Sequence, residues 1–189
     1  MLSKNNVIFT KSCFIIILFS TAALIAAFAF EYIGGLKPCS LCIYQRIPHG
    51  LAISLCMVTL VFKLSPQSVV RIFVILAFTS LVGAGIALFH VGVEQQFWPG
   101  TQGCGSTIEA TSVEAFRLKL LQQPIVRCDE IAWSLFGVSM AGYNLILSLG
   151  LSFIPAFAIF KWRNIKAQAW NREKWNSQNS RATYPGRIL

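Results

Sequence analysis

The residues best suited to chemistry lie in one short stretch, residues 38–46, which reads PCSLCIYQR. Two cysteines, Cys39 and Cys42, are separated by two residues, and Arg46 follows the second cysteine by four. A disulfide between such close cysteines closes a very small loop, so it adds little to stability. Because such pairs are more often active in thiol–disulfide exchange, the spacing predicts a redox-active disulfide.

A helix that begins near Cys39 would hold these side chains in a useful arrangement. Cys42 would lie in the first turn, where unpaired N–H groups and the positive end of the helix stabilise a thiolate. Arg46 would lie one turn further along on the same face, where its charge lowers the pKa of a nearby sulfur and stabilises charge on an electron acceptor. The alternative for Arg46 is a simple anchor at the lipid boundary. His49 continues the same stripe, and we assign it no role.

The composition indicates that these elements lie in a membrane. Of the 189 residues, 55% are hydrophobic and 12% are charged, whereas a soluble domain usually carries about 25% charged residues. Four stretches contain no Asp, Glu, Lys or Arg: 12–30, 47–62, 72–93 and 131–160. A spanning helix needs about 20 residues, so we expect an all-α membrane protein, a bundle of four transmembrane helices. The expected spans are residues 12–30, 43–62, 72–92 and 136–160.

Length or charge decides how three of these spans are interpreted. The first run exceeds the usual apolar core of a signal peptide, about 7–15 residues, which favours an uncleaved helix. The second span includes Arg46 at one end, where a long basic side chain can reach the interface. The fourth run is longer than one span, so we expect its beginning, with Trp133, at the interface and a bend at Pro155.

The distribution of charge predicts the orientation of the bundle. The formal net charge is +9, and seven of the 16 basic residues follow Phe160. The N-terminal segment and the 63–71 connection are also basic and carry no acidic residue. The positive-inside rule therefore puts both termini on the cytoplasmic side and the loops at 31–42 and 94–133 on the outer side. We expect residues 1–165 to form the membrane domain and residues 166–189 a poorly ordered basic tail. Since the charge trails a span, we expect no nucleic-acid partner.

The cysteines divide according to this topology. Cys13 and Cys56 lie inside apolar runs, where a free cysteine behaves as a small hydrophobic residue. The outer loops hold the other four: Cys39, Cys42, Cys104 and Cys128. Outer compartments are where disulfides persist. A zinc site usually takes two close pairs or added histidines, so we expect no metal. Purely structural disulfides are the remaining alternative.

The stretch at residues 38–46 resembles the signature of the bacterial disulfide bond formation protein B (DsbB) family. The likeness covers most of the chain: four spans, a close cysteine pair in the first outer loop, a separated pair in the second, His90 at the outer end of the third span and Trp133 after Cys128. Ser40 and Gln45 depart from better-known members at spacer positions. The vitamin K epoxide reductase family shares the four-helix quinone chemistry, but its close pair follows the loop cysteines in sequence, whereas here it precedes them.

The resemblance implies an electron route through the four outer cysteines. A periplasmic thioredoxin-fold oxidase, similar to DsbA, forms a mixed disulfide with Cys104, whose resting partner is Cys128. The Cys104–Cys128 disulfide is regenerated by exchange with Cys39–Cys42, through a Cys39–Cys128 disulfide. Cys42 then donates electrons to a membrane quinone with the help of Arg46. The implied activity is that of a thiol:quinone oxidoreductase of the bacterial inner membrane, which makes disulfides de novo.

The implied cofactor is ubiquinone or menaquinone. The resemblance suggests that His90 and Trp133 lie near the quinone head group, where the histidine could hydrogen-bond a carbonyl. The alternatives are a capping or interfacial histidine and an ordinary interfacial tryptophan.

The second outer loop is expected to contain a short helix. Residues 111–114 read TSVE, and Val113, Phe116 and Leu120 recur on one face. A capping box followed by this pattern predicts an amphipathic helix on the membrane surface, which would tether the loop and leave Cys104 mobile. A helix packed on protein is the alternative.

Two rival functional classes stay open. A non-enzymatic membrane scaffold could carry the same cysteines as structural disulfides, and those cysteines would not cycle. A transporter is disfavoured, because the four apolar stretches hold no acidic residue and the chain shows no repeated halves.

Overall fold

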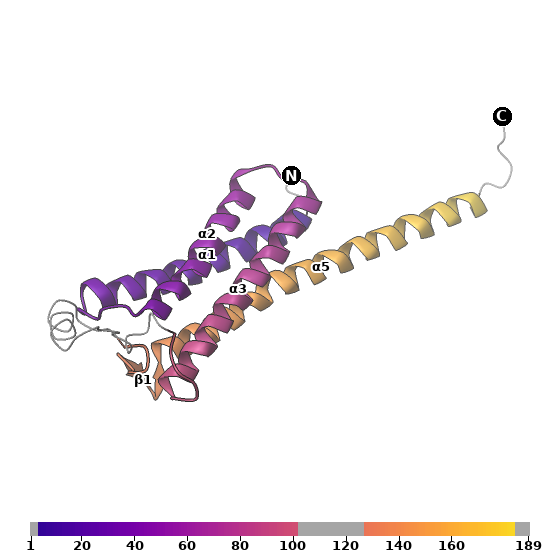
Figure 1. Cartoon of the computed structure of the whole chain (residues 1–189). Helices are drawn as coiled ribbons and strands as arrows, with labels where there is room; N and C mark the ends of the chain where they lie inside the picture. The colour runs from indigo at the N-terminus through magenta and orange to yellow at the C-terminus, as the bar shows by residue number, and fades with distance from the viewer. Residues whose placement is uncertain (1–3, 102–126, 184–189) are drawn as a thin grey trace, which may run out of the picture.

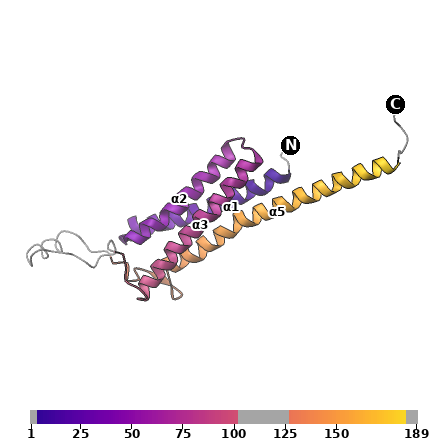
Figure 2. The same cartoon turned by 45° about the vertical axis from the view of Figure 1, so that its right-hand side comes forward.

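Four long helices make up most of the structure (Figures 1 and 2). The computed structural model describes residues 4–101 and 127–183. The helices are α1 (Lys4–Tyr32), α2 (Ser40–Val61), α3 (Pro66–Glu94) and α5 (Met140–Thr183), and a short hairpin pairs β1 (Ser134–Leu135) with β2 (Val138–Ser139). Each of the four helices is long and apolar enough to cross a membrane. The expected all-α fold with four apolar helices is therefore confirmed, and the protein is a multi-pass membrane protein.

Successive helices run in opposite directions, which gives the bundle two distinct ends (Figure 1). One end holds the beginning of α1, the α2–α3 connection and the extension of α5. The other end holds the α1–α2 connection, the end of α3 and the β1–β2 hairpin. Cys39, Cys42 and Cys128 all lie at this second end, in one packed cluster. The arrangement suits the expected topology, and the side of the membrane that each end faces stays a prediction.

Side-chain caps decide where α2 and α3 begin. The Cys39 Sγ accepts a hydrogen bond from the Cys42 backbone N–H at 3.3 Å, and the Ser65 Oγ accepts one from the Ser68 N–H at 3.2 Å. Pro66 suits the first position of α3, where an N–H would have no helical partner. Both helices are longer than their expected spans, which began at residues 43 and 72, because a helix begins at its cap and not at the last charged residue.

The fourth helix begins later than the expected residue 136, because a tight turn precedes it. Phe136 and Gly137 form the two-residue loop between β1 and β2, with φ values of 51° and 79°. Positive φ at both positions is the geometry of a type I′ turn, which favours glycine. Ser139 then accepts a hydrogen bond from the Gly142 N–H at 3.1 Å and caps α5.

The C-terminal part of α5 differs from the expected disordered tail. We expected poor order from residue 166 onward, but α5 continues to Thr183 and projects beyond the other helices (Figures 1 and 2). Residues 156–184 contain neither Gly nor Pro, and many of them are strong helix formers. The Lys166 ammonium also lies over the Trp162 ring, 4.8 Å from its centre and one turn away. High polarity predicted disorder here, whereas backbone propensity favours a helix.

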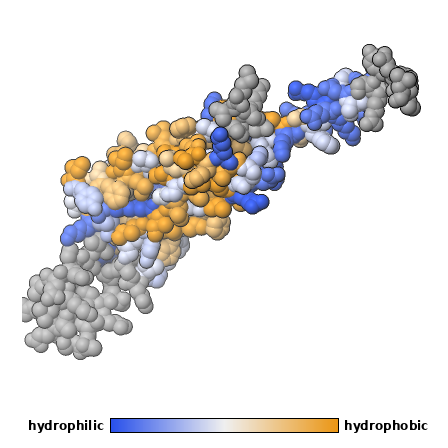
Figure 3. Space-filling view, turned by 90° about the horizontal axis from the view of Figure 1, so that it is seen from above, coloured by the Kyte–Doolittle hydropathy of each residue, from blue (hydrophilic) through white to orange (hydrophobic). Residues whose placement is uncertain are grey.

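The bundle has a core of small and apolar side chains and an apolar exterior. Cys13 and Cys56 are fully buried beside Phe73, as expected for cysteines that act as small hydrophobic residues. Phe78 and Phe153 are 67% and 70% exposed, and Figure 3 shows apolar side chains over the bundle and polar ones on the far part of α5. Such an exterior requires lipid as its solvent.

α2 and α3 approach each other closely where Pro48 faces Gly83. A Cβ atom on Gly83 would lie 3.1 Å from the Pro48 Cβ, so a larger residue would push the helices apart. This contact is one turn from Gln45 and two turns from His90, and it holds α3 where His90 reaches the beginning of α2.

Candidate functional site

Cys39 and Cys42 lie together at the beginning of α2. Both are free thiols in the structure, and their Sγ atoms are 2.9 Å apart. Cys39 is buried and Cys42 is half-buried. A disulfide bond is about 2.05 Å long, so a small movement of the side chains closes the pair. The cap of α2 thus brings the two sulfurs of the predicted redox pair together.

The surroundings of this pair favour a thiolate on Cys39. A hydrogen bond with the Cys42 thiol lowers the pKa of Cys39 to about 4 against the opposing effect of burial, and His90 and the Cys42 backbone N–H lower it further. Sequence reasoning expected the first-turn N–H groups to favour a thiolate at Cys42. In the structure the Cys42 N–H points to the Cys39 Sγ instead, because a capping side chain folds back over the first turn.

His90 reaches this pair from α3. Its Nε2 lies 3.6 Å from the Cys39 Sγ, and its Nδ1 lies 2.8 Å from the Gln45 Nε2. Glu94 Oε1 is 3.9 Å from the His90 Nε2. The resemblance implied a place beside a quinone, whereas the structure places His90 beside a sulfur, with the imidazole 4% exposed.

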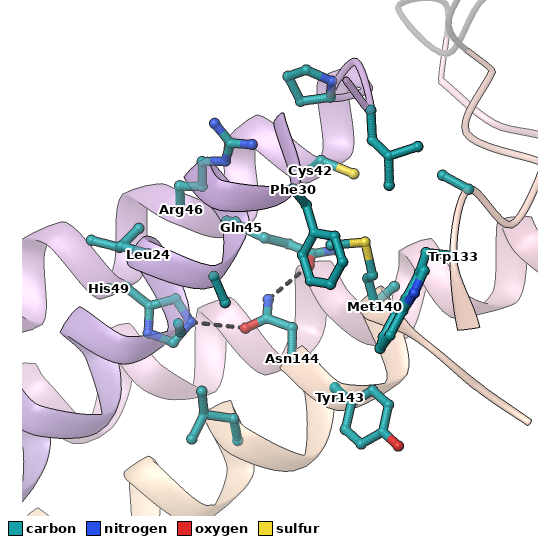
Figure 4. A pocket seen from close by; sticks show the side chains of 18 of the residues that line it. Leu24, Phe30, Cys42, Gln45, Arg46, His49, Trp133, Met140, Tyr143 and Asn144 are labelled. Atoms are coloured by element: carbon teal, nitrogen blue, oxygen red, sulfur yellow. Dashed lines mark hydrogen bonds between the residues drawn. The ribbon is translucent and has the colours of Figure 1, made fainter. Parts of the chain in front are cut away.

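A cavity of about 420 Å³ opens beside Cys42. It lies between α1, α2, the hairpin and α5 (Figure 4). Phe30 and Trp133, whose ring centres are 4.9 Å apart, form part of its apolar wall. Its volume falls within the range of small-molecule sites, about 300–1,000 Å³. Trp133 thus lines a cavity, and its place beside a quinone stays a prediction, while His90 is not among the described residues that line the cavity.

Arg46 lines the same cavity and is held by two neighbours. Its Nη1 donates to the Glu31 Oε2 at 2.5 Å, and its guanidinium lies over the Phe28 ring, 4.9 Å from the ring centre. Among the side chains that the structure describes, the Arg46 Nε is the buried nitrogen or oxygen that lacks a hydrogen-bond partner. With a side chain 18% exposed, Arg46 does not resemble a simple anchor at the lipid boundary.

Three polar side chains that sequence reasoning left without a role also line the cavity: Gln45, His49 and Asn144 (Figure 4). Asn144 Nδ2 donates to the Gln45 Oε1 at 2.7 Å, and the Asn144 Oδ1 lies 2.8 Å from the His49 Nε2. Gln45 had been treated as a spacer, and Asn144 had been overlooked. A lone amide inside an apolar spanning segment is the signal that could have identified Asn144.

Cys128 packs in the same cluster as the pair. It is fully buried in a cluster with Cys39, Leu41 and Val93. It is disulfide-bonded, with a partner outside the described residues. Cys104 and the helix expected at residues 111–120 also lie outside the described residues, so their roles stay predictions. The structure therefore packs Cys128 in one cluster with Cys39, with Cys42 against that cluster, and of the close pair it is Cys42 that lines the cavity.

Comparisons with known proteins point to one family. Residues 10–158 match the family model described as disulfide bond formation protein DsbB. A disulfide bond formation protein B from Methylococcus capsulatus is 31% identical over 173 residues, 87% of this chain and 96% of the relative. Disulfide bond formation protein B 2 from Pseudomonas putida is 28% identical over 169 residues, 85% of this chain and 94% of the relative. An uncharacterized protein from Rickettsia prowazekii is 28% identical over 150 residues, 77% of this chain and 85% of the relative.

No solved structure matches the chain significantly. The family model nevertheless covers well over half of the chain, and the close cysteine pair, Arg46 and Trp133 lie together at one end of a four-helix bundle. The chain therefore belongs to the disulfide bond formation protein B (DsbB) family of thiol:quinone oxidoreductases.

Proposed function

We propose that this protein oxidises a periplasmic DsbA-like thiol oxidase and passes the electrons through two cysteine pairs to ubiquinone or menaquinone. The observation that carries the proposal is the cavity beside Cys42, which joins a redox sulfur, the unpartnered Arg46 Nε and apolar walls in one space. A bound quinone accepts two electrons and two protons. Two thiols and a quinone thus become one disulfide and one quinol.

The residues around the cavity fit a quinone head group. A flat ring with two carbonyl oxygens needs apolar walls and at least one hydrogen-bond donor. Phe30 and Trp133 supply aromatic walls, and the Arg46 Nε supplies a donor that no group in the described part of the chain uses. The guanidinium charge also stabilises negative charge that develops on a quinone oxygen. The cavity thus offers what the head group requires.

The positions of Cys39 and Cys42 support a division of roles between them. Cys128 packs with Cys39, and Cys42 lines the cavity. A Cys128 thiolate that attacks Cys39 forms the Cys39–Cys128 bond, breaks the Cys39–Cys42 bond and releases Cys42 as a thiolate beside the cavity.

The second exchange returns the loop disulfide to its resting form. The second thiol of the oxidase first displaces Cys104 from the mixed disulfide, which leaves the oxidase with its disulfide and Cys104 as a thiolate. The Cys104 thiolate then attacks Cys128, forms Cys104–Cys128, breaks Cys39–Cys128 and releases Cys39 as a thiolate. A thiol with a low pKa leaves faster, and the His90 Nε2 at 3.6 Å and the Cys42 backbone N–H at 3.3 Å both favour a Cys39 thiolate in this step. Cys39 and Cys42 then form their disulfide again as two electrons pass to the quinone.

We further propose that the end of the bundle with the cysteines faces the periplasm and that both termini are cytoplasmic. The N-terminus, the α2–α3 connection and the basic extension of α5 share one end (Figure 1), which suits the positive-inside rule. In intact cells that have been reduced, an impermeant thiol reagent should label Cys104. Labelling only after the inner membrane is permeabilised would contradict this orientation.

The decisive experiment measures thiol-dependent quinone reduction. Purified protein is mixed with a reduced DsbA-like oxidase and a soluble quinone analogue, and quinone absorbance is followed. The wild type should reduce quinone catalytically, and Cys42→Ser should not. Cys56→Ala is the matched control, because it removes a buried cysteine of the same helix that lies far from the cavity, and it should stay active.

The alternative is a scaffold with structural disulfides. Such a protein would show no thiol-dependent quinone reduction in this assay, with the wild type and Cys42→Ser behaving alike, and that result would make the scaffold the better account.

A further inference from the structure

Hydrogen bonds lead from Cys39 into the interior of the bundle. The Cys39 Sγ is 3.6 Å from the His90 Nε2, and the His90 Nδ1 is 2.8 Å from the Gln45 Nε2. All three side chains are buried, with exposed fractions of 7% or less. These contacts join the cap of α2, the end of α3 and the second turn of α2.

The same series continues through the middle of the bundle. Gln45 Oε1 accepts from the Asn144 Nδ2 at 2.7 Å, and the Asn144 Oδ1 is 2.8 Å from the His49 Nε2. The His49 Nδ1 lies 3.4 Å from the Ser20 Oγ. We refer to Ser20, His49, Asn144, Gln45 and His90 as the amide–histidine chain. Its members come from all four helices.

The two amides give the amide–histidine chain a direction. An amide nitrogen only donates and an amide oxygen only accepts. Gln45 turns its nitrogen to His90 and its oxygen to Asn144, and Asn144 turns its nitrogen to Gln45 and its oxygen to His49. Rotating one amide alone would bring two oxygens or two NH₂ groups face to face. The two amides can therefore reverse only together.

In the observed direction every donor points toward Cys39. The Gln45 N–H makes the His90 Nδ1 an acceptor, so the neutral ring carries its proton on Nε2, and this N–H is directed at the Cys39 Sγ. The Asn144 Oδ1 likewise requires the proton of His49 on Nε2. Glu94 Oε1, at 3.9 Å from the His90 Nε2, is beyond hydrogen-bond distance. The Cys39 Sγ is thus the acceptor of the hydrogen bond from the His90 Nε2–H.

We propose that Gln45, Asn144 and His49 are positioning residues that hold His90 in its Nε2–H tautomer and thereby stabilise the Cys39 thiolate of the reduced protein. This inference rests on the proposed function, since it assigns these residues to the redox cycle of Cys39. The amides transmit orientation and not protons, because an amide N–H keeps its proton at neutral pH. Stabilising a thiolate makes the pair a stronger oxidant, which suits a protein that supplies disulfides.

Several titratable or charged groups face Cys39. Cys42 lies on α2, and His90 and Glu94 lie on α3. Arg46 lines the cavity beside Cys42. Cys128, on the segment before the hairpin, is disulfide-bonded and does not titrate. A variant that tests the proposal must leave all of these groups in place, and substitutions of Gln45, Asn144 and Ser20 do so.

Nitrogen-15 NMR tests the tautomers directly. The protein contains two histidines, so histidine-labelled protein gives signals from His49 and His90 alone. In the reduced, quinone-free wild type we expect both rings to carry their proton on Nε2. Gln45→Met should release His90 from this tautomer. A wild-type ring that carries its proton on Nδ1, or a His90 tautomer that is unchanged in Gln45→Met, would overturn the proposal.

The pH profile of Cys39 alkylation tests the consequence for the thiolate. Reduced full-length protein is treated with iodoacetamide over a pH series, and modification of Cys39 is quantified by mass spectrometry. Loss of a hydrogen bond to a charged group changes an equilibrium by about tenfold, so Gln45→Met should raise the midpoint by about one pH unit. Asn144→Leu should have a smaller effect and Ser20→Ala the smallest.

Ser152→Ala is the matched control for this series. The Ser152 hydroxyl is buried in α5 and donates to the Leu149 carbonyl at 2.7 Å, outside the amide–histidine chain. The midpoint of Cys39 alkylation in Ser152→Ala should equal that of the wild type. An unchanged midpoint in Gln45→Met that retains the wild-type unfolding temperature would refute the proposal. Neither measurement uses a quinone, so a wild type that fails to reduce quinone but shows the expected tautomers would count against the proposed function alone.

Discussion

Among the described residues, two pairs of neighbouring cysteines lie at different places along α2, and their surroundings differ. Cys13 and Cys56 connect α1 to α2 inside the apolar core, where both are fully buried and hydrogen-bonded to each other. Cys39 and Cys42 lie at a helix cap, between the cluster that contains Cys128 and a cavity. Both pairs are free thiols in the structure.

The difference shows what a redox pair needs beyond two nearby sulfurs. A thiol reacts as its thiolate, so the pair needs donors that stabilise negative charge, and His90 and the Cys42 N–H serve Cys39 in this way. The pair also needs a route for electrons in and out. The core pair has apolar neighbours such as Phe73, and it lines none of the cavity beside Cys42.

The largest expected effect comes from removing one cysteine from each pair. Cys39→Ser should abolish quinone reduction, because Cys128 then has no Cys39 sulfur to attack and Cys42 has no partner with which to form a disulfide. Cys13→Ala should retain activity close to that of the wild type. The measurement is the rate of quinone reduction with a reduced DsbA-like oxidase. Equal rates of quinone reduction in Cys39→Ser and Cys13→Ala would contradict the assignment of the redox role to the Cys39–Cys42 pair.

A pH series should separate the two pairs in the wild-type protein. Since the pKa of Cys39 is lowered to about 4, this thiol is mostly a thiolate at pH 6, and its alkylation should fall only as the pH drops through about 4. An ordinary thiol, with a pKa near 8.5, holds well under about 1% thiolate at pH 6. Cys13 and Cys56 should stay unmodified until the protein is unfolded in detergent. Early modification of either core cysteine would show that burial does not protect it.

Arg46→Met should sharpen the comparison by impairing the cavity while leaving both pairs intact. The variant loses the unpartnered Nε donor and the charge beside Cys42. A hydrogen bond from a charged donor contributes about 1.5–3 kcal/mol, so KM for the quinone analogue should rise by about tenfold or more. Arg71→Met, an exposed arginine of α3, is the control and should leave KM unchanged. A rise of equal size in both variants would indicate a general loss of basic charge.

Trp133→Leu should have the smallest effect. Trp133 contacts Phe30 across the apolar wall of the cavity, and an aromatic pair contributes about 0.5–1.5 kcal/mol beyond its buried area. We therefore expect KM for the quinone analogue to rise by about two- to tenfold, with an unchanged alkylation profile of Cys39. Trp98→Leu, outside the cavity, is the control. A shift in the pH profile of Cys39 alkylation in Trp133→Leu would show that the cavity wall also affects the cysteine pair.

Much of the fold could be predicted from local patterns. Runs without charge located four helices because the membrane excludes unpaired charge over a whole span. The same criterion misplaced the beginnings of α2, α3 and α5, which depend on the caps formed by Cys39, Ser65 and Ser139. The extension of α5 was missed because its polar composition suggested disorder, while its lack of Gly and Pro favours a helix.

The spacing of Cys39, Cys42 and Arg46 by itself predicted redox chemistry on one face of α2, because residues three and four apart share one helical face, and the apolar run that follows predicted that this chemistry lies at the beginning of a span. The resemblance implied that Cys39 meets Cys128, but only the tertiary structure decided which sulfur lines the cavity and what His90 touches. The contact of Gln45 with Asn144 joins residues that are 99 positions apart. Such a contact depends on how whole helices pack, and no local pattern records it.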